Sequence, residues 1–336
     1  MERKRVLSGM RPSGRLHLGN LHGALDNWVR FQEEFDCFYF VADWHALTTE
    51  YAAPHDIGGD TFEMIVDWLA AGIDPTRSTI FIQSRIPEHA ELHLLLSMIT
   101  PLPWLERNPT YKEQMAEITD KDLTTYGFLG YPVLQAADIV LYKAHYVPVG
   151  VDQLPHVELT REIVRRFNHF YGEIFPVPEA KLTEVPKLPG VDGRKMSKSY
   201  GNAIYLGDSA ETVEEKVLTA KTDPARARRH DPGEPLNCAA IYPLHRLYTP
   251  AEELPMIEAN CRGAKWGCVE CKGHLLGHMQ ARLEPIREQR GLYRSHPEKV
   301  RKVIEDGIER ATAVARQSME EVRDAMGLGA LPLGGD

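Results

Sequence analysis

The feature that most constrains the fold is a strand, a glycine-containing turn and a helix at the start of the chain, followed at once by a second strand. Residues 5–9 are a short strand candidate, 10–14 form a Pro/Gly turn, and 18–34 carry apolar side chains at helical spacing. Residues 37–42 are continuously apolar, as expected of a central parallel strand covered on both faces. This opening of a βαβ unit predicts an α/β fold with a doubly wound parallel sheet, whose ligands bind outside the carboxyl ends of the strands.

The same alternation continues further along the chain. We expect a helix over 57–71, a strand over 79–83, a helical insertion near 101–145, a strand at 147–149 and a strongly patterned helix over 154–171. The insertion would lie over one edge of the sheet.

Length and composition indicate two domains. With 336 residues and 43% hydrophobic content, the chain can bury a substantial core, and a domain usually has about 100 to 200 residues. We expect a Rossmann-like catalytic domain over 1–205, in which a proline-rich stretch at 176–189 leads into a loop at 193–201. Residues 206–336 have a helical pattern almost to their end and would form an all-helical second domain.

The net charge of −9 argues against a general nucleic-acid coat, because unspecific phosphate binding needs a basic surface. A specific RNA contact is compatible with it. No run approaches the about 18 apolar residues that a membrane-spanning helix needs, and the first residues lack the apolar core of a signal peptide. We therefore expect a cytoplasmic protein without a membrane partner.

His17, at the start of the first predicted helix, is the first candidate for chemistry. A helix N-terminus beside Gly19 can present an imidazole and backbone amides to a polyphosphate. His17 would then stabilise the charge that develops on an α-phosphate during in-line displacement. Standing alone, such a histidine is more simply a capping or surface residue.

The second candidate is a loop of sequence GRKMSKSYG at 193–201. Glycines at both ends allow it to move, Lys195 and Lys198 are cationic, and Ser197 and Ser199 supply hydroxyl groups. Such a loop can close on the β and γ phosphates and reopen to release pyrophosphate. A lysine-rich loop alone is usually just solvated, but together with the histidine turn it favours ATP-dependent activation of a carboxylate.

These segments resemble known signatures. Residues 17–20 (HLGN) and 195–199 (KMSKS) resemble the HIGH and KMSKS motifs of class I aminoacyl-tRNA synthetases, with Asn20 in place of the final histidine. Four longer segments are similar to the tryptophanyl-tRNA synthetases: 8–14 (SGMRPSG), 41–48 (VADWHALT), 131–139 (YPVLQAADI) and 147–153 (VPVGVDQ). The resemblance covers essentially the whole chain.

The resemblance implies a two-step ligase. L-tryptophan and ATP, with Mg²⁺ on the phosphates, give tryptophanyl-adenylate and pyrophosphate, and the aminoacyl group then passes to the terminal adenosine of tRNA(Trp). It also implies that the helical domain over 206–336 binds the tRNA anticodon and that the protein is a homodimer.

The resemblance implies five tryptophan-binding residues. Asp138 matches the acceptor of the indole N–H, and a single buried acceptor fits tryptophan because its ring has one donor and no acceptor. Tyr131 and Gln153 match positions that hold the α-amino group, His45 matches one near the carboxylate, and Gln135 would line the indole pocket. Without the resemblance, Asp138 is a buried and paired acid, and His45 is nearly as well explained as a core histidine.

The resemblance also implies an ATP site and catalytic residues. Asp152 is expected at the ribose hydroxyls, Leu188 would touch the adenine through its backbone, and Arg11 stands where many relatives have glutamine, so that it would add a fixed charge near the phosphates. The expected catalytic residues are His17, Asn20, Lys195, Ser197 and Lys198. The full ATP set is Met10, Arg11, Pro12, Ser13, Gly19, Asn20, Gly150, Val151, Asp152, Leu188, Lys195, Met196, Ser197, Lys198 and Ser199.

Four of the five cysteines, Cys238, Cys261, Cys268 and Cys271, fall in the second part of the chain. Because disulfides are rare in the cytoplasm, clustered thiols indicate a metal or cluster site. The pattern suits either four-thiolate Zn²⁺ or a cubane iron–sulfur cluster, and four unrelated reduced cysteines are a third interpretation. The spacing is similar to that of a subset of tryptophanyl-tRNA synthetases with a [4Fe-4S] cluster, and this similarity implies such a cluster here.

Basic and aromatic side chains surround these cysteines. Lys265, Trp266 and Lys272 would suit the unstacked bases of a single-stranded loop. The densest basic run, over 221–229, is as well explained as a solvated loop.

The sequence disfavours three other functions. A tyrosyl-tRNA synthetase would have to bind a phenolic hydroxyl, and the segment 131–139 disfavours it. An adenylate-forming enzyme without tRNA is disfavoured by the size of the helical part. An inactive paralogue that binds RNA or senses an amino acid is disfavoured by the intact His17 and 195–199.

Overall fold

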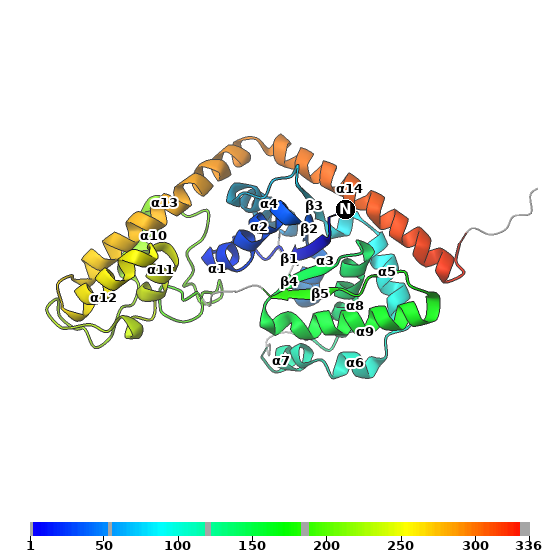
Figure 1. Ribbon diagram of the computed structural model, residues 1–336, viewed down its shortest axis with the longest axis horizontal. Helices are drawn as coiled ribbons and strands as arrows, with labels where there is room; N and C mark the ends of the chain where they lie inside the picture. Colours follow the sequence, from blue (N-terminus) through cyan, green and yellow to red (C-terminus); the bar gives the residue numbers. More distant parts are fainter. Residues whose placement is uncertain (1–2, 53–55, 118–121, 183–187, 330–336) are drawn as a thin grey trace, which may run out of the picture.

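A five-stranded, fully parallel sheet forms the centre of the computed structural model, which describes residues 3–52, 56–117, 122–182 and 188–329 (Figure 1). The strand order is β3-β2-β1-β4-β5. The strands are β1 (Arg5–Met10), β2 (Asp36–Val41), β3 (Ser78–Ile82), β4 (Tyr146–Val149) and β5 (Glu179–Leu182). The predicted doubly wound α/β fold is therefore confirmed.

Helices cover both faces of the sheet, as its apolar strands require. Side chains of Cys37, Tyr39 and Val41 pack into the core on one face, while Phe38 and Phe40 pack into a second core on the other. This alternation follows from the period of two along a strand, and β2 is continuously apolar because both of its faces are buried.

The first half of the chain supplies most of the helices around the sheet. They are α1 (Leu18–Asn20), α2 (Asp26–Glu34), α3 (Asp43–Glu50), α4 (Ile57–Ala71), α5 (Glu88–Ser97), α6 (Leu102–Glu106), α7 (Pro109–Glu117), α8 (Tyr126–Leu141) and α9 (Leu154–Tyr171). Single helical turns η1 (Leu21–Leu25), η2 (Gln83–Arg85) and η3 (Val151–Gln153) connect some of them.

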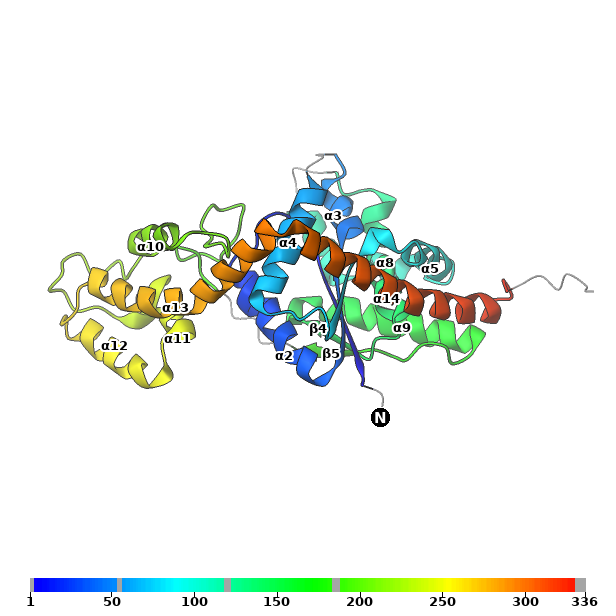
Figure 2. The same cartoon turned by 90° about the horizontal axis from the view of Figure 1, so that it is seen from above.

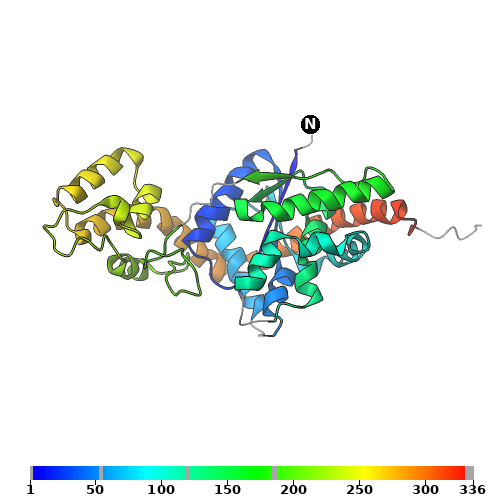
Figure 3. The same ribbon diagram turned by 90° about the horizontal axis from the view of Figure 1, so that it is seen from below.

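The second half is helical, as predicted. Its elements are α10 (Ala210–Thr219), η4 (Pro235–Asn237), α11 (Ile241–Tyr248), η5 (Ala251–Glu253), α12 (Leu254–Arg262), α13 (Cys268–Ser295) and α14 (Pro297–Ala325). The group α10–α12 lies at one end of the molecule, apart from the sheet, as the view from below shows (Figure 3).

Two differences from the predicted elements lie next to the site. The expected helix over 18–34 is interrupted by a π-helical turn, η1, between α1 and α2. The strand β5 falls within the proline-rich stretch at 176–189, which was not predicted as a strand; residues 183–187 of that stretch lie outside the described part. β5 is an edge strand whose side chains are exposed or half-buried, so it carries no apolar alternation from which a strand could be predicted.

The long helices α13 and α14 arch over the molecule and link its two ends (Figures 1 and 2). α13 packs along α4, and α14 packs against β3, α5 and α8. At Gly307 the backbone of α14 comes so close to β3 that a Cβ atom there would lie 1.7 Å from the carbonyl oxygen of Ile80. Residues 297–325 of the predicted helical domain thus pack onto the sheet, and the expected division at residue 205 stays a prediction.

A buried ion pair fastens α13 to α4. Arg290 Nε lies 2.6 Å from Asp67 Oδ1, and the guanidinium also pairs with Glu63. Burial raises the pKa of Asp67 more than the charge of Arg290 lowers it. Within the described residues, no helix has the length and apolar character to cross a membrane.

Candidate active site

A cavity of about 430 Å³ opens at the carboxyl ends of β1 and β4. Met10 and Arg11 line it from the end of β1, and Val149 and Gly150 line it from the end of β4. The chain leaves β1 toward β2 on one side, whereas β4 joins β1 on the other side. The cavity therefore lies at the topological switch point, where open α/β sheets bind their ligands.

All five residues that were predicted to bind tryptophan line this cavity: His45, Tyr131, Gln135, Asp138 and Gln153. They come from α3, α8 and η3, which the fold brings together from three separate segments. This co-location does not by itself assign their roles.

Asp138 is the most buried ionisable group of the cavity, with 1% of its surface exposed. Its Oδ2 lies 2.8 Å from His45 Nε2, and its Oδ1 lies 2.8 Å from Gln83 Nε2 and 2.7 Å from His89 Nδ1. Burial alone would raise the pKa of Asp138, but the hydrogen bonds from His45 and His89 outweigh burial and lower the pKa. The side chain is therefore an anion that only accepts hydrogen bonds.

Gln83 and His89 were not predicted from the sequence. Gln83 stands in η2 after β3 and its Oε1 accepts the backbone N–H of Trp44, 3.2 Å away, so that it ties α3 to Asp138. His89 stands in α5, and its second nitrogen lies 2.7 Å from the hydroxyl of Tyr142. Neither belongs to a recognisable motif, and only the packing of α5 on α8 places His89 beside the carboxylate.

Tyr131 faces the cavity with its hydroxyl held at a fixed position. The hydroxyl lies 3.0 Å from His156 Nε2, and Asn108 Nδ2 lies 3.3 Å from the other nitrogen of that imidazole. Burial raises the pKa of Tyr131 to about 12, although the nearby charge of Arg11 lowers it in part. The phenol is therefore neutral at physiological pH, and His156 is a further cavity residue that the sequence did not reveal.

His17 caps the helix that follows it. Its Nδ1 accepts the backbone N–H of Gly19 at 3.0 Å, and the backbone N–H of His17 donates to Asn20 Oδ1 at 3.0 Å. A Cβ on residue 19 would lie 2.8 Å from the imidazole, so the close approach of the ring requires glycine there. Burial, and then the charge of Lys198, lower the pKa of His17 to about 4. The ring is neutral at pH 7 and, with Nδ1 as acceptor, carries its proton on Nε2.

The lysine-serine loop reaches the first turn of the chain. Lys198 Nζ donates to the carbonyl oxygen of Ser13 at 2.8 Å, and burial lowers the pKa of this ammonium group. The side chain of Asn202 binds the loop backbone: its Oδ1 accepts the backbone N–H of Ser197 and its Nδ2 donates to the carbonyl oxygen of Lys195. Met196 is buried, which anchors the loop to the core.

The predicted ATP residues and the predicted catalytic His17 thus fall into two groups. Met10, Arg11 and Gly150 line the cavity, whereas Ser13, His17 and Lys198 lie close to one another. Leu188 is buried under the loop, where its carbonyl oxygen accepts the N–H of Met196 at 2.9 Å. The side chain of Asp152 lies outside the described part of the structure, so its predicted ribose contact cannot be placed. The remaining predicted residues, Pro12, Gly19, Asn20, Val151, Lys195, Ser197 and Ser199, belong to these same turns.

The four cysteines of the second half come together. Cys238 follows η4, Cys261 lies in α12, and Cys268 and Cys271 lie in the first turn of α13. The pKa of Cys271 is raised to about 12, first by burial and then by the three other thiols as thiolates. His245 Nε2 lies 3.3 Å from its sulfur.

Arginine side chains line a second cavity, of about 480 Å³, beside these cysteines. Arg226, Arg228 and Arg229 contribute to it, and Arg228 and Arg229 are exposed. Lys272, however, is only 6% exposed, and its Nζ donates to the carbonyl oxygens of Leu218 and Ala220 at 2.7 and 2.6 Å. The prediction that Lys272 belongs to an RNA-binding surface is therefore wrong, because its charge is used to hold the end of α10.

Comparison with known proteins defines the class. The family of class I tRNA synthetases for tryptophan and tyrosine (W and Y) matches residues 1–284. With its parallel sheet, switch-point cavity, histidine turn and lysine-serine loop, the chain belongs to this family of class I aminoacyl-tRNA synthetases.

Within that family, relatives at 42 to 55% identity are tryptophan–tRNA ligases. A tryptophan–tRNA ligase of Thermotoga maritima is 55% identical to this chain, over 96% of this chain and 99% of the relative. One of Ralstonia nicotianae is 46% identical, over 97% and 98% of the two chains. The crystal structure of the Campylobacter jejuni tryptophanyl-tRNA synthetase, complexed with ADP and tryptophan, has a TM-score of 0.86 at 33% identity and covers 96% of this chain and 100% of that one.

Proposed function

We propose that this protein is a tryptophan–tRNA ligase. It activates L-tryptophan with ATP to tryptophanyl-adenylate and pyrophosphate, and then transfers the aminoacyl group to the terminal adenosine of tRNA(Trp). The sequence relatives and the solved neighbour bound to ADP and tryptophan support this function. Because aminoacyl-tRNA is consumed by translation, the enzyme would act in the cytoplasm.

The observation that carries the amino-acid specificity is the buried carboxylate of Asp138. A carboxylate has about four acceptor positions, and three are used by His45, Gln83 and His89. The remaining one suits the single N–H of an indole ring. A phenol carries its donor, the hydroxyl, at another place on its ring, so a fixed buried acceptor placed for the indole N–H discriminates against it by position.

The other cavity residues would orient the amino acid. The neutral hydroxyl of Tyr131, held by His156, and the side chain of Gln153 would bind the α-amino group, and Gln135 would line the ring. His45 would lie near the substrate carboxylate while its Nε2–H remains bonded to Asp138. Held in this way, the carboxylate of the substrate faces the ATP-binding turns at the mouth of the cavity.

The histidine turn and the lysine-serine loop would act on ATP. His17 is neutral with a proton on Nε2, so it would donate a hydrogen bond to the α-phosphate without repelling Lys198. Asn20 would position His17 through its hydrogen bond to the backbone. Lys195, Ser197, Lys198 and Ser199 would bind the β and γ phosphates, where Mg²⁺ neutralises charge when it is bound.

Pyrophosphate exchange tests this function. Exchange of labelled pyrophosphate into ATP should depend on tryptophan and should be absent with tyrosine or with no amino acid. Exchange with tyrosine alone would favour a tyrosyl enzyme, and no exchange with any amino acid would favour an inactive paralogue. Tryptophan-dependent exchange without charging of tRNA(Trp) would contradict the second step only.

The four cysteines would hold a [4Fe-4S] cluster. Four thiolates about 2.3 Å from one Zn²⁺ lie about 3.8 Å from one another. In the described residues, the only three possible ligating atoms within 4.8 Å of one another belong to Glu253, His274 and His278, so no three of the sulfurs are so close. This wider spacing supports a cubane cluster, which places irons and sulfides between its cysteines. When bound, the cluster would supply a rigid link among η4, α12 and α13.

Metal analysis after anaerobic purification tests the cluster. We expect about four irons and about four sulfides per chain and no zinc bound by the cysteines. Zinc without iron, retained when Glu253, His274 and His278 are replaced, would replace the cluster by a four-thiolate zinc site. Light scattering in solution should in addition give the mass of a homodimer.

A further inference from the structure

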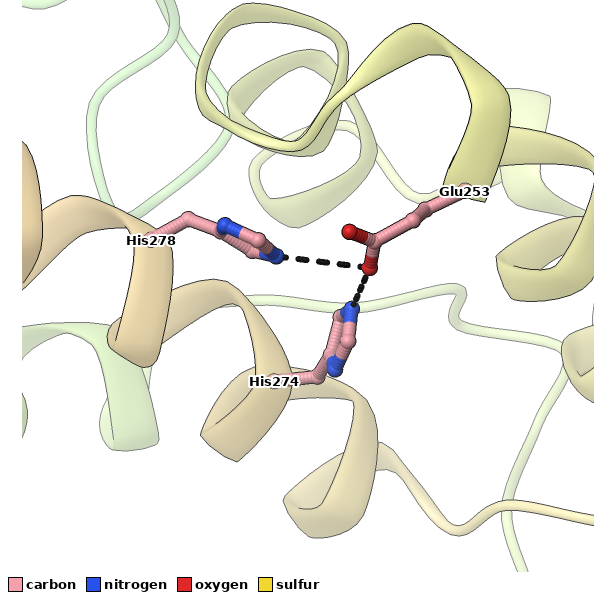
Figure 4. A group of neighbouring side chains, drawn as sticks. All are labelled: Glu253, His274 and His278. Atoms are coloured by element: carbon pink, nitrogen blue, oxygen red, sulfur yellow. Dashed lines mark hydrogen bonds and ion pairs between the residues drawn. The ribbon is translucent and has the colours of Figure 1, made fainter.

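We propose that Glu253, His274 and His278 form a second metal site, for a first-row transition-metal cation such as Zn²⁺, distinct from the four cysteines. His274 and His278 are one turn apart on α13, so both imidazoles project from the same face of the helix. Glu253, the last residue of η5, faces them from the neighbouring segment (Figure 4). Three ligating groups from two elements therefore converge on one point.

The distances from Glu253 to the two imidazoles are close to those around a small tetrahedral ion, and all three ligating atoms lie within 4.8 Å of one another. Glu253 Oε2 lies 2.8 Å from His274 Nε2 and 3.4 Å from His278 Nε2. Zinc binds imidazole nitrogen and carboxylate oxygen at about 2.0 to 2.2 Å, so two such ligands lie about 3.4 Å apart in a tetrahedron. One contact already has this length, and the other has to open by about half an ångström, which a rotation of the glutamate side chain provides.

The ligand types select the class of cation. Imidazole nitrogen binds Zn²⁺, Co²⁺, Ni²⁺ and Cu²⁺ well, whereas Mg²⁺ and Ca²⁺ prefer oxygen-only sites. The side chains of His274, His278 and Glu253 are 28%, 27% and 32% exposed. An ion can therefore reach them from solvent and keep a water as its fourth ligand. The Mg²⁺ that accompanies ATP would therefore not occupy this site.

The surroundings hold the imidazoles in place. The ring of His274 packs against those of Trp266 and His245, with centroids 5.3 and 6.2 Å away. His245 in turn contacts the sulfur of Cys271. The proposed site thus lies beside the four cysteines, and an ion in it would fix η5 and the start of α12 against α13.

Without a metal, the same contacts are explained by one carboxylate oxygen that accepts an N–H from each imidazole. The two interpretations predict different behaviour, because hydrogen bonds require no cation. The proposal does not rest on the catalytic function, so its test does not involve enzyme activity.

Cobalt titration of the intact protein, with its cysteine site as purified, distinguishes a metal site from hydrogen bonds that need no metal. We expect one Co²⁺ per chain to bind with visible d–d absorption and without the intense near-ultraviolet bands of thiolate ligation. The variants Glu253→Gln, His274→Gln and His278→Gln should each bind at least about tenfold more weakly. His296→Gln, which alters another histidine paired with a carboxylate on the surface, should bind normally. Excess Mg²⁺ should not compete.

Folding of the variants is checked in the same samples. Zn²⁺ should raise the unfolding midpoint of the parent and of His296→Gln but not of the three ligand variants, whose midpoints without metal should stay near that of the parent. Iron and sulfide contents should also be unchanged. No added binding in the parent, thiolate bands, or equal binding in all variants would each overturn the proposal.

Discussion

At the scale of single residues, the state of His17 governs how the histidine turn works. Burial and Lys198 lower its pKa to about 4, from an ordinary value of about 6.5. Between these two pH values the unfolded chain binds a proton that the folded chain does not. The free energy of unfolding therefore falls as the pH falls through this window. Above it, His17 contributes nothing to the pH dependence of the free energy of unfolding.

We therefore expect His17→Gln to unfold with a weaker dependence on pH between about 6.5 and about 4 than the parent. Urea unfolding at several pH values measures this. The same slope of unfolding free energy against pH in parent and variant would show that His17 titrates normally.

Pyrophosphate exchange at pH 7 should drop by about 100-fold or more in the His17→Gln variant, because a donor to the transition state is lost.

Asp138 and Asp67 form a matched pair of buried aspartates with different expected roles, each 1% exposed. Asp138→Asn should lower kcat/KM for tryptophan in pyrophosphate exchange by about 100-fold, because the amide no longer offers a buried anion to the indole. Asp67→Asn, which disturbs the ion pair with Arg290, should lower the free energy of unfolding and leave KM for tryptophan unchanged. An unchanged tryptophan KM in Asp138→Asn would remove Asp138 from the substrate site.

The residues of the candidate site were predictable from sequence to different degrees. His17 and Lys198 lie in motifs whose spacing is informative, and Asp138 stands out as an acid in an apolar helix. Gln83 and His89 follow β3 in short segments without a motif. His89 contacts Asp138 because α5 packs on α8, and Gln83 reaches the same carboxylate from η2; no local pattern encodes either contact.

At the scale of elements, the contact of α14 with β3 leaves no room for a side chain at Gly307. Gly307→Ala would place a Cβ against the backbone of Ile80 and should lower the free energy of unfolding by about 3 kcal/mol. Gly291→Ala in α13, where a Cβ meets nothing within 4 Å, should raise it by about 0.5 to 1 kcal/mol. Chemical unfolding of both variants measures the difference, and similar values for the two would contradict this packing.

The elements themselves were predictable where their ends are marked. α4 agrees with its prediction because Asp56 caps its start and Gly72, with a φ of 110°, ends it. α9 agrees because apolar residues recur along its buried face and Gly172 follows it. The π-helical turn η1 has no such marker, and β5 is an exposed edge strand whose side chains follow no buried pattern.

At the scale of the whole molecule, the arginine-lined cavity and the cavity at the switch point should be separable in function. Arg228 and Lys265 are exposed near the four cysteines, and cationic side chains there would bind tRNA phosphates. Arg228→Ala and Lys265→Ala should each lower the rate of tRNA charging several-fold while tryptophan-dependent pyrophosphate exchange is unchanged. Equal loss of both activities would contradict this separation.

Lys272→Ala is the comparison for those variants. Its ammonium group binds two carbonyl oxygens at the end of α10, so this change should lower the unfolding midpoint instead of acting on tRNA alone. Far-ultraviolet circular dichroism during heating measures that shift.

The position of α14 has a consequence for synthesis on the ribosome. Ala311, Ala315 and Met319 of this helix complete the apolar core over the sheet face that Phe81 of β3 begins. More than 200 residues separate β3 from α14 along the chain. A nascent chain that stops before residue 297 would therefore hold its strands and the turns proposed to bind ATP. It would leave the part of this face that α14 covers open to water, where chaperones and proteases recognise it.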